Sequence, residues 1–168
     1  KGGNQAVSCA RQGARVRMDG CVGADAHGRA LSDALAQDGI DIAGVQIDAQ
    51  QPTGVALVMV DDGAQNRIVV IPGANACVQV DEAALARALQ GAAFLLVQFE
   101  TPLAQVARAL EVAVRVGCKV LLNPSRVDAM PATFWSCIDT LVVNEIEAQT
   151  LCGLSVHGPA PAAGAAWG

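Results

Sequence analysis

Apolar and polar residues along the chain follow two different periods, and their order predicts alternating helices and strands. Residues 3–12 have helical composition, and Gly13 follows them as a C-terminal stop. The apolar run 16–22 predicts a strand. Leu31 and Leu35 lie four positions apart and place an apolar stripe on a second helix that ends at Gly39, before a short strand at residues 45–47.

The second half of the chain repeats this alternation. Asp81 and Glu82 favour the start of a helix that runs to Leu89, because acidic side chains suit the positive end of the helix dipole. The unbroken apolar residues 94–97 predict a strand buried on both faces. Residues 102–116 have helical spacing, strands are expected at 118–122 and 138–143, and a further helix begins at residues 145–151. Strand, helix and strand in this order imply parallel strands joined by right-handed crossovers.

Between these halves the pattern changes to that of a β-hairpin. Residues 53–60 and 67–71 are rich in β-branched side chains and flank Asp61, Asp62 and Gly63, which turn easily because Asp and Gly tolerate positive φ. At the other end, residues 158–168 are almost entirely Gly, Ala and Pro, and we expect a disordered tail there.

Composition favours a layered α/β fold and argues against two kinds of partner. The 168 residues are 52% hydrophobic but only 3% aromatic, so the core must consist of small aliphatic side chains between closely spaced layers. The net charge is -5 and the 11 Lys and Arg residues form no cluster, which argues against nucleic acid. No apolar stretch approaches the roughly 20 residues that cross a bilayer. With no signal peptide in the sequence, we expect a soluble cytoplasmic enzyme without a membrane partner.

The six cysteines indicate neither a disulfide framework nor a metal site. They are scattered without a CxxC pair, and the two histidines, His27 and His157, have no partners at ligand spacing. We therefore expect buried free thiols. Trp135, next to Phe134, is expected to anchor a helix near Pro131 to the sheet.

The chain opens with glycines at the start of a helix. Gly2 and Gly3 would let a ligand approach the backbone and its unpaired N–H groups, with Lys1 and Asn4 on either side. The segment is neither a Walker A loop nor a dinucleotide fingerprint. From these residues alone, a terminal turn with incidental glycines is an equally good interpretation.

The spacing further along the chain favours the functional interpretation. Asn4, Ala6, Gly13 and Gly23 are followed, in order and with loop-sized gaps, by residues 52–56, residues 72–75, Gln98 and Glu100, Asn123 and Pro124, and Asn144, Glu145 and Glu147. In this order the segments resemble the PfkB carbohydrate kinases, and the ribokinase branch more than any other. The resemblance implies a ribokinase-like three-layer α/β/α fold with a mostly parallel sheet and a projecting hairpin lid at about residues 53–71. It makes residues 1–157 a partial, truncated sugar kinase domain.

The resemblance also implies a sugar site. The family's Gly-rich turn, its Asn and a Glu after a buried strand bind the sugar, which carries over to Lys1, Gly2, Gly3, Asn4 and Glu100. Asn offers both a donor and an acceptor to a hydroxyl. Glu100 would stand at the carboxyl edge of a parallel sheet, where such sheets bind ligands. The alternative for Glu100 is a helix N-terminal charge ahead of Pro102, favourable by about 0.3 to 1 kcal/mol.

A second implied site concerns the nucleotide. Asn144 and Glu147 match the family's NxxE motif, which implies ATP binding by Asn144 and an indirect contact of Glu147 with Mg²⁺ through water. The alternative is a helix cap at Asn144 with Glu147 in the first turn, a cap being favourable by about 1 kcal/mol. Both can hold, because a helix start is also an anion site.

The implied reaction is ATP-dependent phosphorylation of D-ribose, or a similar pentose, at its primary hydroxyl. The resemblance implies ATP and Mg²⁺ as cofactors, leaves a monovalent cation open, and implies a homodimer through the lid. The family's catalytic Asp belongs to a GAGD motif that this sequence lacks, so we expect no catalytic base and an inactive fragment. Two alternatives remain: another PfkB enzyme such as a fructokinase or nucleoside kinase, and a non-catalytic sugar-binding or interaction module.

Three residues depart from the family pattern. Arg17 and Asp19 alternate on a predicted strand where relatives have apolar residues, and we expect buried charges there to be costly unless paired. Ala24 replaces one of two acids usual before Asp25. The family's other lid strands precede Lys1, so a partly unsupported lid is expected.

Overall fold

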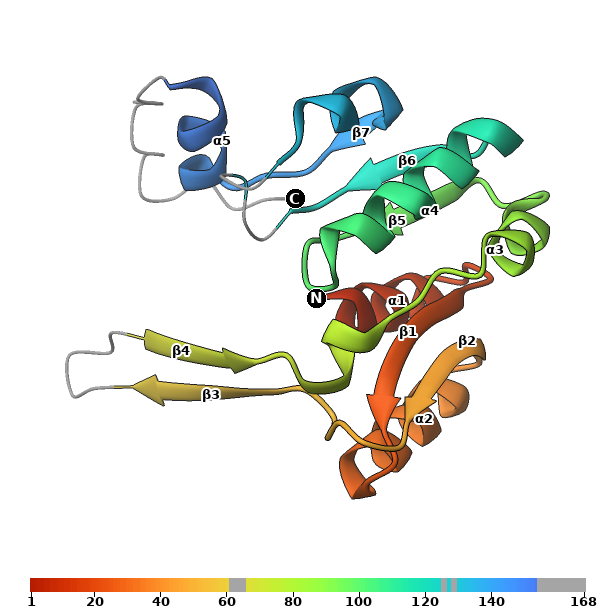
Figure 1. Ribbon diagram of the computed structural model, residues 1–168, viewed down its shortest axis with the longest axis vertical. Coiled ribbons are helices and arrows are strands. Elements are labelled where there is room, and N and C mark those ends of the chain that lie inside the picture. Colours follow the sequence, from red (N-terminus) through yellow and green to blue (C-terminus); the bar gives the residue numbers. More distant parts are fainter. Residues whose placement is uncertain (61–65, 125–126, 128–129, 154–168) are drawn as a thin grey trace.

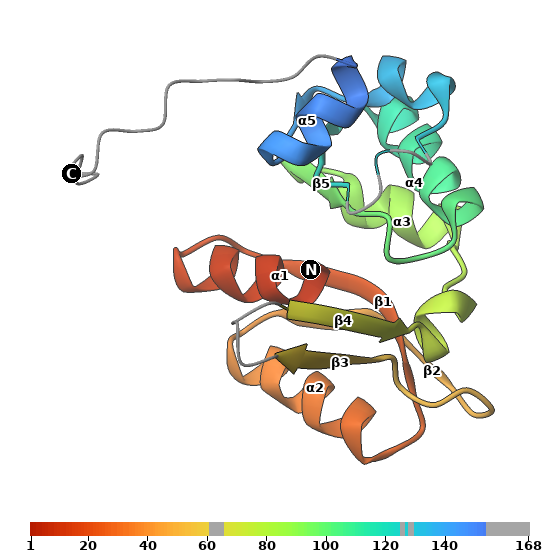
Figure 2. The same ribbon diagram turned by 90° about the vertical axis from the view of Figure 1, so that its left-hand side faces the viewer.

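A computed structural model describes residues 1–60, 66–124, 127 and 130–153 and contains alternating helices and strands (Figure 1). The strands form two parallel sheets and one antiparallel hairpin. Helices lie on both sides of the strands, α1 and α2 on one side and α3 and α4 on the other (Figure 2). The predicted α/β fold, with parallel strands, three layers and a projecting hairpin, is confirmed.

The N-terminal part is a two-stranded parallel sheet covered by two helices. In chain order its elements are α1 (Gly2–Arg11), β1 (Arg17–Gly23), α2 (Ala26–Gln37) and β2 (Asp41–Asp48). Helix α2 begins where the Asp25 side chain accepts a hydrogen bond from the Gly28 backbone N–H, an N-cap. The crossover through α2 makes β1 and β2 parallel, with Val22 opposite Ile47. Strand β2 is longer than the predicted residues 45–47.

The C-terminal part holds the larger core. Its elements are α3 (Glu82–Leu89), β5 (Phe94–Val97), α4 (Leu103–Val116), β6 (Lys119–Leu122), η3 (Ala132–Cys137), β7 (Thr140–Leu141) and α5 (Glu145–Cys152). The strands are parallel in the order β5-β6-β7. Leu110 and Leu122 are fully buried between α4 and this sheet. Strand β7 is much shorter than the predicted residues 138–143.

The hairpin consists of β3 (Val55–Val60) and β4 (Asn66–Ile71), and it projects from the body of the molecule (Figure 1). The strands are antiparallel, with Leu57 opposite Val69 and Val58 opposite Ile68. No other described strand pairs with them. After β4 the chain enters the short helix η1 (Gly73–Cys77) beside β1. The predicted turn residues 61–63, the tail 158–168 and His157 lie outside the described residues.

One prediction about burial was wrong, and the expected cost of two charges on β1 does not arise. Strand β5 is not buried on both faces, because Phe94 is 47% and Leu96 36% exposed, and only β6 pairs with β5 in the described part of the chain. Arg17 and Asp19 are not buried charges. They form an ion pair, with Nε of Arg17 3.0 Å from Oδ2 of Asp19, on a strand edge that is partly open to solvent. Gly44, opposite Asp19, leaves room for the carboxylate because a Cβ there would collide with it.

Two smaller predictions also need correction. All six cysteines are free, but only Cys21 and Cys118 are buried, while Cys152 is exposed. The aromatic anchor is Phe134, which is buried against Phe99 in an edge-to-face contact, whereas Trp135 is 49% exposed.

Candidate functional site

Lys1 connects three segments that are far apart in the sequence. Its backbone nitrogen donates to Oε2 of Glu100 over 2.7 Å, just past the end of β5. Its Nζ lies 3.3 Å from the carbonyl oxygen of Pro124 and 3.8 Å from Oε1 of Glu147. The glycine turn, Glu100 and the start of α5 therefore meet at the carboxyl ends of β5, β6 and β7, the edge at which open parallel sheets bind ligands.

The glycines of the first turn of α1 have different surroundings. A Cβ on Gly2 would lie 3.0 Å from Oε1 of Gln98 and 3.4 Å from Cε of Met18, so a side chain does not fit easily. A Cβ on Gly3 would meet no protein atom within 4 Å. Lys1, as N-cap, makes no side-chain capping bond, and the first N–H groups of a helix lack intrahelical partners. The turn is therefore open to a ligand at Gly3 but packed against Gln98 and Met18 at Gly2.

Asn4 is not brought into the same cluster. Its exposed side chain lines a shallow hollow along α1 together with Val7, Ser8, Arg11 and Gln12. No described residue contacts both Asn4 and Glu100 through a hydrogen bond. Of the five residues predicted for the sugar, the structure thus groups Lys1, Gly2, Gly3 and Glu100, with Asn4 on the flank.

Asn144 and Glu147 form a capping box at the start of α5. Oδ1 of Asn144 accepts from the Glu147 backbone N–H over 2.8 Å, and Oε2 of Glu147 accepts from the Asn144 backbone N–H over 3.0 Å. The helix-cap alternative is therefore present in the structure. The cap uses neither Nδ2 of Asn144, which makes no hydrogen bond with described residues, nor Oε1 of Glu147, which lies 3.8 Å from Nζ of Lys1.

Three side-chain amides that sequence analysis left without a role join α1 to the C-terminal sheet. Gln98 donates through Nε2 to Gln5, and Gln5 donates through Nε2 to Oδ1 of Asn123 over 3.0 Å. Asn123 donates through Nδ2 to the Val142 carbonyl over 2.7 Å. Gln98 and Asn123 follow strands β5 and β6, whose ends face the ligand edge, but nothing in the sequence indicated that they pair with Gln5 on α1.

The base of the hairpin is held by a carboxylate. Asp25 accepts hydrogen bonds from the Thr53 hydroxyl, the Thr53 backbone N–H and the Gly28 backbone N–H over 2.7 to 2.8 Å. The Thr53 hydroxyl is the largest cause that lowers the pKa of Asp25 to about 2. The hairpin base is thus fixed to the start of α2.

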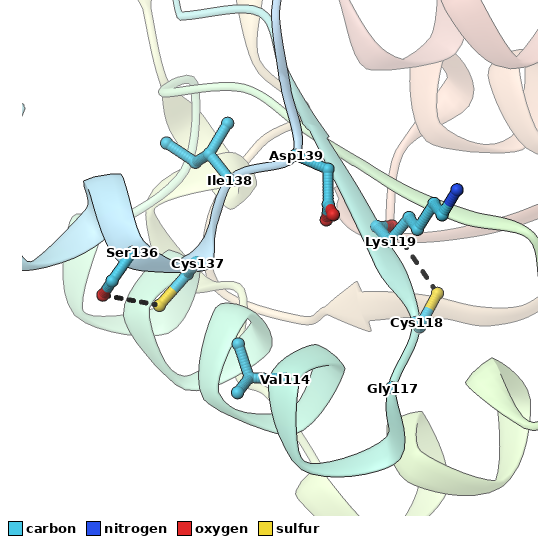
Figure 3. A pocket seen from close by; sticks show the side chains of 8 residues that line it. All are labelled: Val114, Gly117, Cys118, Lys119, Ser136, Cys137, Ile138 and Asp139. Atoms are coloured by element: carbon cyan, nitrogen blue, oxygen red, sulfur yellow. Dashed lines mark hydrogen bonds between the residues drawn. The ribbon is translucent and has the colours of Figure 1, made fainter.

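A separate hollow of about 230 Å³ lies at the opposite end of β6 (Figure 3). It is lined by Val114, Gly117, Cys118, Lys119, Ser136, Cys137, Ile138 and Asp139. Burial raises the pKa of the Cys118 thiol, which makes it a poor nucleophile. None of the candidate site residues lines this hollow. Within the described ranges, no group of three or more His, Cys, Asp or Glu side chains could hold a metal ion.

A glycine turn, a carboxylate and a capped helix start lie together at the carboxyl ends of parallel strands. This arrangement defines an α/β ligand-binding domain of the kind found in sugar kinases. The chain belongs to the pfkB family of carbohydrate kinases, whose family model matches residues 1–166. Within that family it is similar to ribokinases. It is 38% identical over 161 residues to the ribokinase of Haemophilus influenzae, covering 93% of this chain and 51% of that protein. It is 37% identical over 158 residues to the ribokinase of Schizosaccharomyces pombe, covering 90% and 49%.

Solved structures give the same result for the fold. The ribokinase of Arabidopsis thaliana complexed with ribose and ATP superposes with a TM-score of 0.81 at 29% identity, over 90% of this chain and 50% of that one. The crystal structure of Sa239 superposes with a TM-score of 0.86 at 32% identity, over 94% and 52%. The ribokinase-like fold is therefore confirmed. The chain spans about half the length of the relatives it matches.

Proposed function

We propose that this chain is the sugar-binding part, with one edge of the nucleotide site, of a kinase that transfers the γ-phosphoryl group of ATP to the primary hydroxyl of D-ribose or a similar pentose. In this proposal residues 1–157 are a partial kinase domain whose lid is the hairpin at about residues 53–71. One observation carries the proposal: Lys1 contacts both Glu100, from the predicted sugar site, and Glu147, from the NxxE motif. The acceptor hydroxyl and the phosphates would then bind side by side.

The sugar would bind at the first turn of α1. Glu100 is 45% exposed and has a carboxylate that can accept hydrogen bonds from hydroxyls, while Lys1 and the free N–H groups of the turn can donate them. Gly3 leaves the backbone open to a ligand. Asn4, on the flank, would reach the sugar only from the exposed side of α1.

Asn144 and Glu147 fit a phosphate contact and a water-mediated contact with Mg²⁺, but not direct coordination of the metal ion. Nδ2 of Asn144 donates to no described residue and is suited to a phosphate oxygen, at a helix start where negative charge is favoured. Glu147 has one oxygen outside the capping box, which fits a contact to the water shell of Mg²⁺ but not direct coordination by several carboxylates. When bound, ATP with its metal ion supplies the phosphoryl group. A monovalent cation is part of the proposal without an assigned residue.

We expect the 168-residue chain alone to turn over negligibly, because the sequence has no GAGD motif to supply the Asp base, and such a base commonly contributes several powers of ten in rate. The proposal includes a homodimer through the hairpin and a cytoplasmic location. No described helix is long and apolar enough to span a membrane.

Gly3→Ala tests the sugar site without disturbing the fold. Its new methyl group would meet no protein atom, so we expect stability to be unchanged or slightly raised. Ribose affinity, measured by titration calorimetry, should fall because the methyl group occupies the space proposed for the sugar. Gly20→Ala, which meets only Met18 at 3.6 Å on β1, is the matched control and should leave affinity intact. Equal ribose affinity in both variants would refute the site.

The substrate is tested by comparing ribose, fructose and adenosine. Phosphorylation is measured in the longest natural protein that carries this chain, and binding in the chain itself. We expect ribose to be preferred in both assays. A preference for fructose or adenosine would assign another activity within the family, and binding of sugar without turnover in the longest natural protein would indicate a non-catalytic module.

A further inference from the structure

The chain of amides described above has a fixed direction. The Val142 carbonyl can only accept a hydrogen bond, so the Asn123 atom that faces it must be the NH₂ group. Oδ1 of Asn123 then faces Gln5, which must donate through Nε2. Oε1 of Gln5 is left as the acceptor for Nε2 of Gln98. The orientation of every amide in the chain follows from one backbone carbonyl.

The amide chain ends at an oxygen, Oε1 of Gln98. Because Gln98 uses its Nε2 to donate to Gln5, its Oε1 points the other way, and a Cβ built on Gly2 would lie 3.0 Å from it. No described residue donates a hydrogen bond to this oxygen. Gln98 is partly buried, so its side chain is held by packing as well as by hydrogen bonds. An oriented acceptor therefore lies over the glycine turn.

The geometry points to Gln98 as a specificity-determining residue whose Oε1 accepts a hydrogen bond from one hydroxyl of the bound sugar, with Gln5 and Asn123 as positioning residues that hold this oxygen in place. The inference rests on the proposed function, since it concerns the same sugar site. A side-chain amide that could rotate freely would present N–H or oxygen equally well. The anchored chain excludes rotation, and the site rejects a sugar that lacks the hydroxyl.

The test uses Gln98→Met, which keeps the length of the side chain and removes both polar atoms. We expect ribose to bind about three- to tenfold more weakly, the effect of losing one neutral hydrogen bond. Calorimetry is repeated with 1-deoxyribose, 2-deoxyribose and 3-deoxyribose. The native chain should bind one of these analogues more weakly than ribose, and Gln98→Met should no longer distinguish that analogue from ribose.

Asn123→Asp tests the positioning role. The carboxylate can still accept a hydrogen bond from Gln5 but places an oxygen against the Val142 carbonyl, so the amide chain loses its anchor. We expect the same loss of discrimination, although Asn123 itself does not touch the sugar. Gln46→Met is the matched control, because Gln46 also donates to and accepts from backbone groups, those of Gln79, but lies on β2. It should leave both affinity and discrimination unchanged.

The outcomes separate the inference from the proposed function. Suppose that the native chain binds ribose, and that Gln98→Met either leaves the affinities unchanged or lowers the affinity for all four sugars by the same factor. The inference is then overturned and the proposed function stands. Retained discrimination in folded Asn123→Asp overturns the positioning role. If the native chain does not bind ribose, the proposed function fails, and the inference fails with it. Circular dichroism and the melting temperature of each variant show whether it has folded.

Discussion

Asp25 and Thr53 are joined by two hydrogen bonds across 28 residues: the Thr53 hydroxyl donates to Oδ1 of Asp25 over 2.7 Å and the Thr53 backbone N–H donates to Oδ2 over 2.8 Å. Thr53 is buried, and its hydroxyl oxygen also accepts from the Gly23 backbone N–H over 3.0 Å. The pair links the end of β1, the start of α2 and the root of the hairpin. The position of the proposed lid therefore depends on one ionised carboxylate.

We predict that Asp25→Asn removes a pH-dependent part of the stability. The hydrogen bonds from Thr53 and Gly28 lower the pKa of Asp25 to about 2 from its ordinary 3.8. A carboxylate with a lowered pKa stabilises the fold above its unfolded-state pKa, and this contribution is lost as the pH falls through the folded-state pKa. The difference in unfolding free energy between the native chain and Asp25→Asn should be largest near neutral pH and shrink between about pH 4 and pH 2.

Urea unfolding followed by circular dichroism at several pH values measures this difference. Asp33→Asn, which removes an exposed carboxylate from the same helix, is the matched control. A difference between native and Asp25→Asn that stays constant from pH 7 to pH 2 would contradict the assignment.

A second prediction concerns the close approach of backbone at the same corner. A Cβ on Gly23 would lie 2.5 Å from the Thr53 nitrogen and 2.6 Å from the Gln51 oxygen, and backbone atoms cannot rotate away. Gly23→Ala should therefore destabilise the chain by about 1 to 3 kcal/mol, as overpacking does. Gly20→Ala, three residues earlier in β1, meets only Met18 at 3.6 Å and should change stability by less than about 0.5 kcal/mol. Equal urea midpoints for the two variants would contradict the prediction that the backbone approach at Gly23 excludes a side chain.

Helices and strands were predictable from the sequence where a local signal, such as helical spacing or a capping residue, determined them. The helical spacing of residues 102–116 predicted α4, since its buried residues Val106 and Leu110 lie one turn apart. Asp81 lies at the start of α3 as expected, and its side chain also caps that helix. The cap given as the alternative for Asn144 is present, because side-chain capping is a local interaction. Burial of β5 was predicted wrongly. Its apolar residues predict a strand, but how far their side chains are exposed depends on which other segments pack against that strand.

The candidate site was predictable only in part. Strand ends predicted that Glu100 and Asn144 would lie at one edge of the sheet, as the contacts of Lys1 with Glu100 and Glu147 support. The amide chain through Gln5, Gln98 and Asn123 was not predictable. It spans 118 residues between Gln5 and Asn123, and neutral amides carry no charge or period that would indicate their partners.

A third prediction separates the two roles of Asn144. Asn144→Asp keeps the oxygen that caps α5 but replaces the NH₂ group with a negatively charged oxygen, whereas Asn144→Ala removes both. Asn144→Ala should cost about 1 kcal/mol of stability and Asn144→Asp close to nothing, since both Asn and Asp are good caps. If Nδ2 binds a phosphate, both variants should lose affinity for ATP, measured by equilibrium dialysis. Native affinity in Asn144→Asp would reduce the role of Asn144 to capping.

The final prediction concerns the two faces of the hairpin, which are both apolar. Leu57 and its partner Val69 are 56% and 46% exposed on one face, and Val58 with its partner Ile68 are 58% and 59% exposed on the other. Apolar surface of this kind on both faces is unusual for a protein surface and favours two occupants. In our proposal one face contacts a second copy of the chain and the other closes over the sugar.

Leu57→Glu and Val58→Glu place one charge on each face without removing a buried contact. One of the two variants, and not both, should convert a dimer to a monomer in sedimentation velocity. The other should remain dimeric and bind ribose more weakly, because a charged lid face closes less well over a sugar. Retention of the dimer in both variants, or a monomeric native chain at high concentration, would contradict the assignment of the hairpin to self-association.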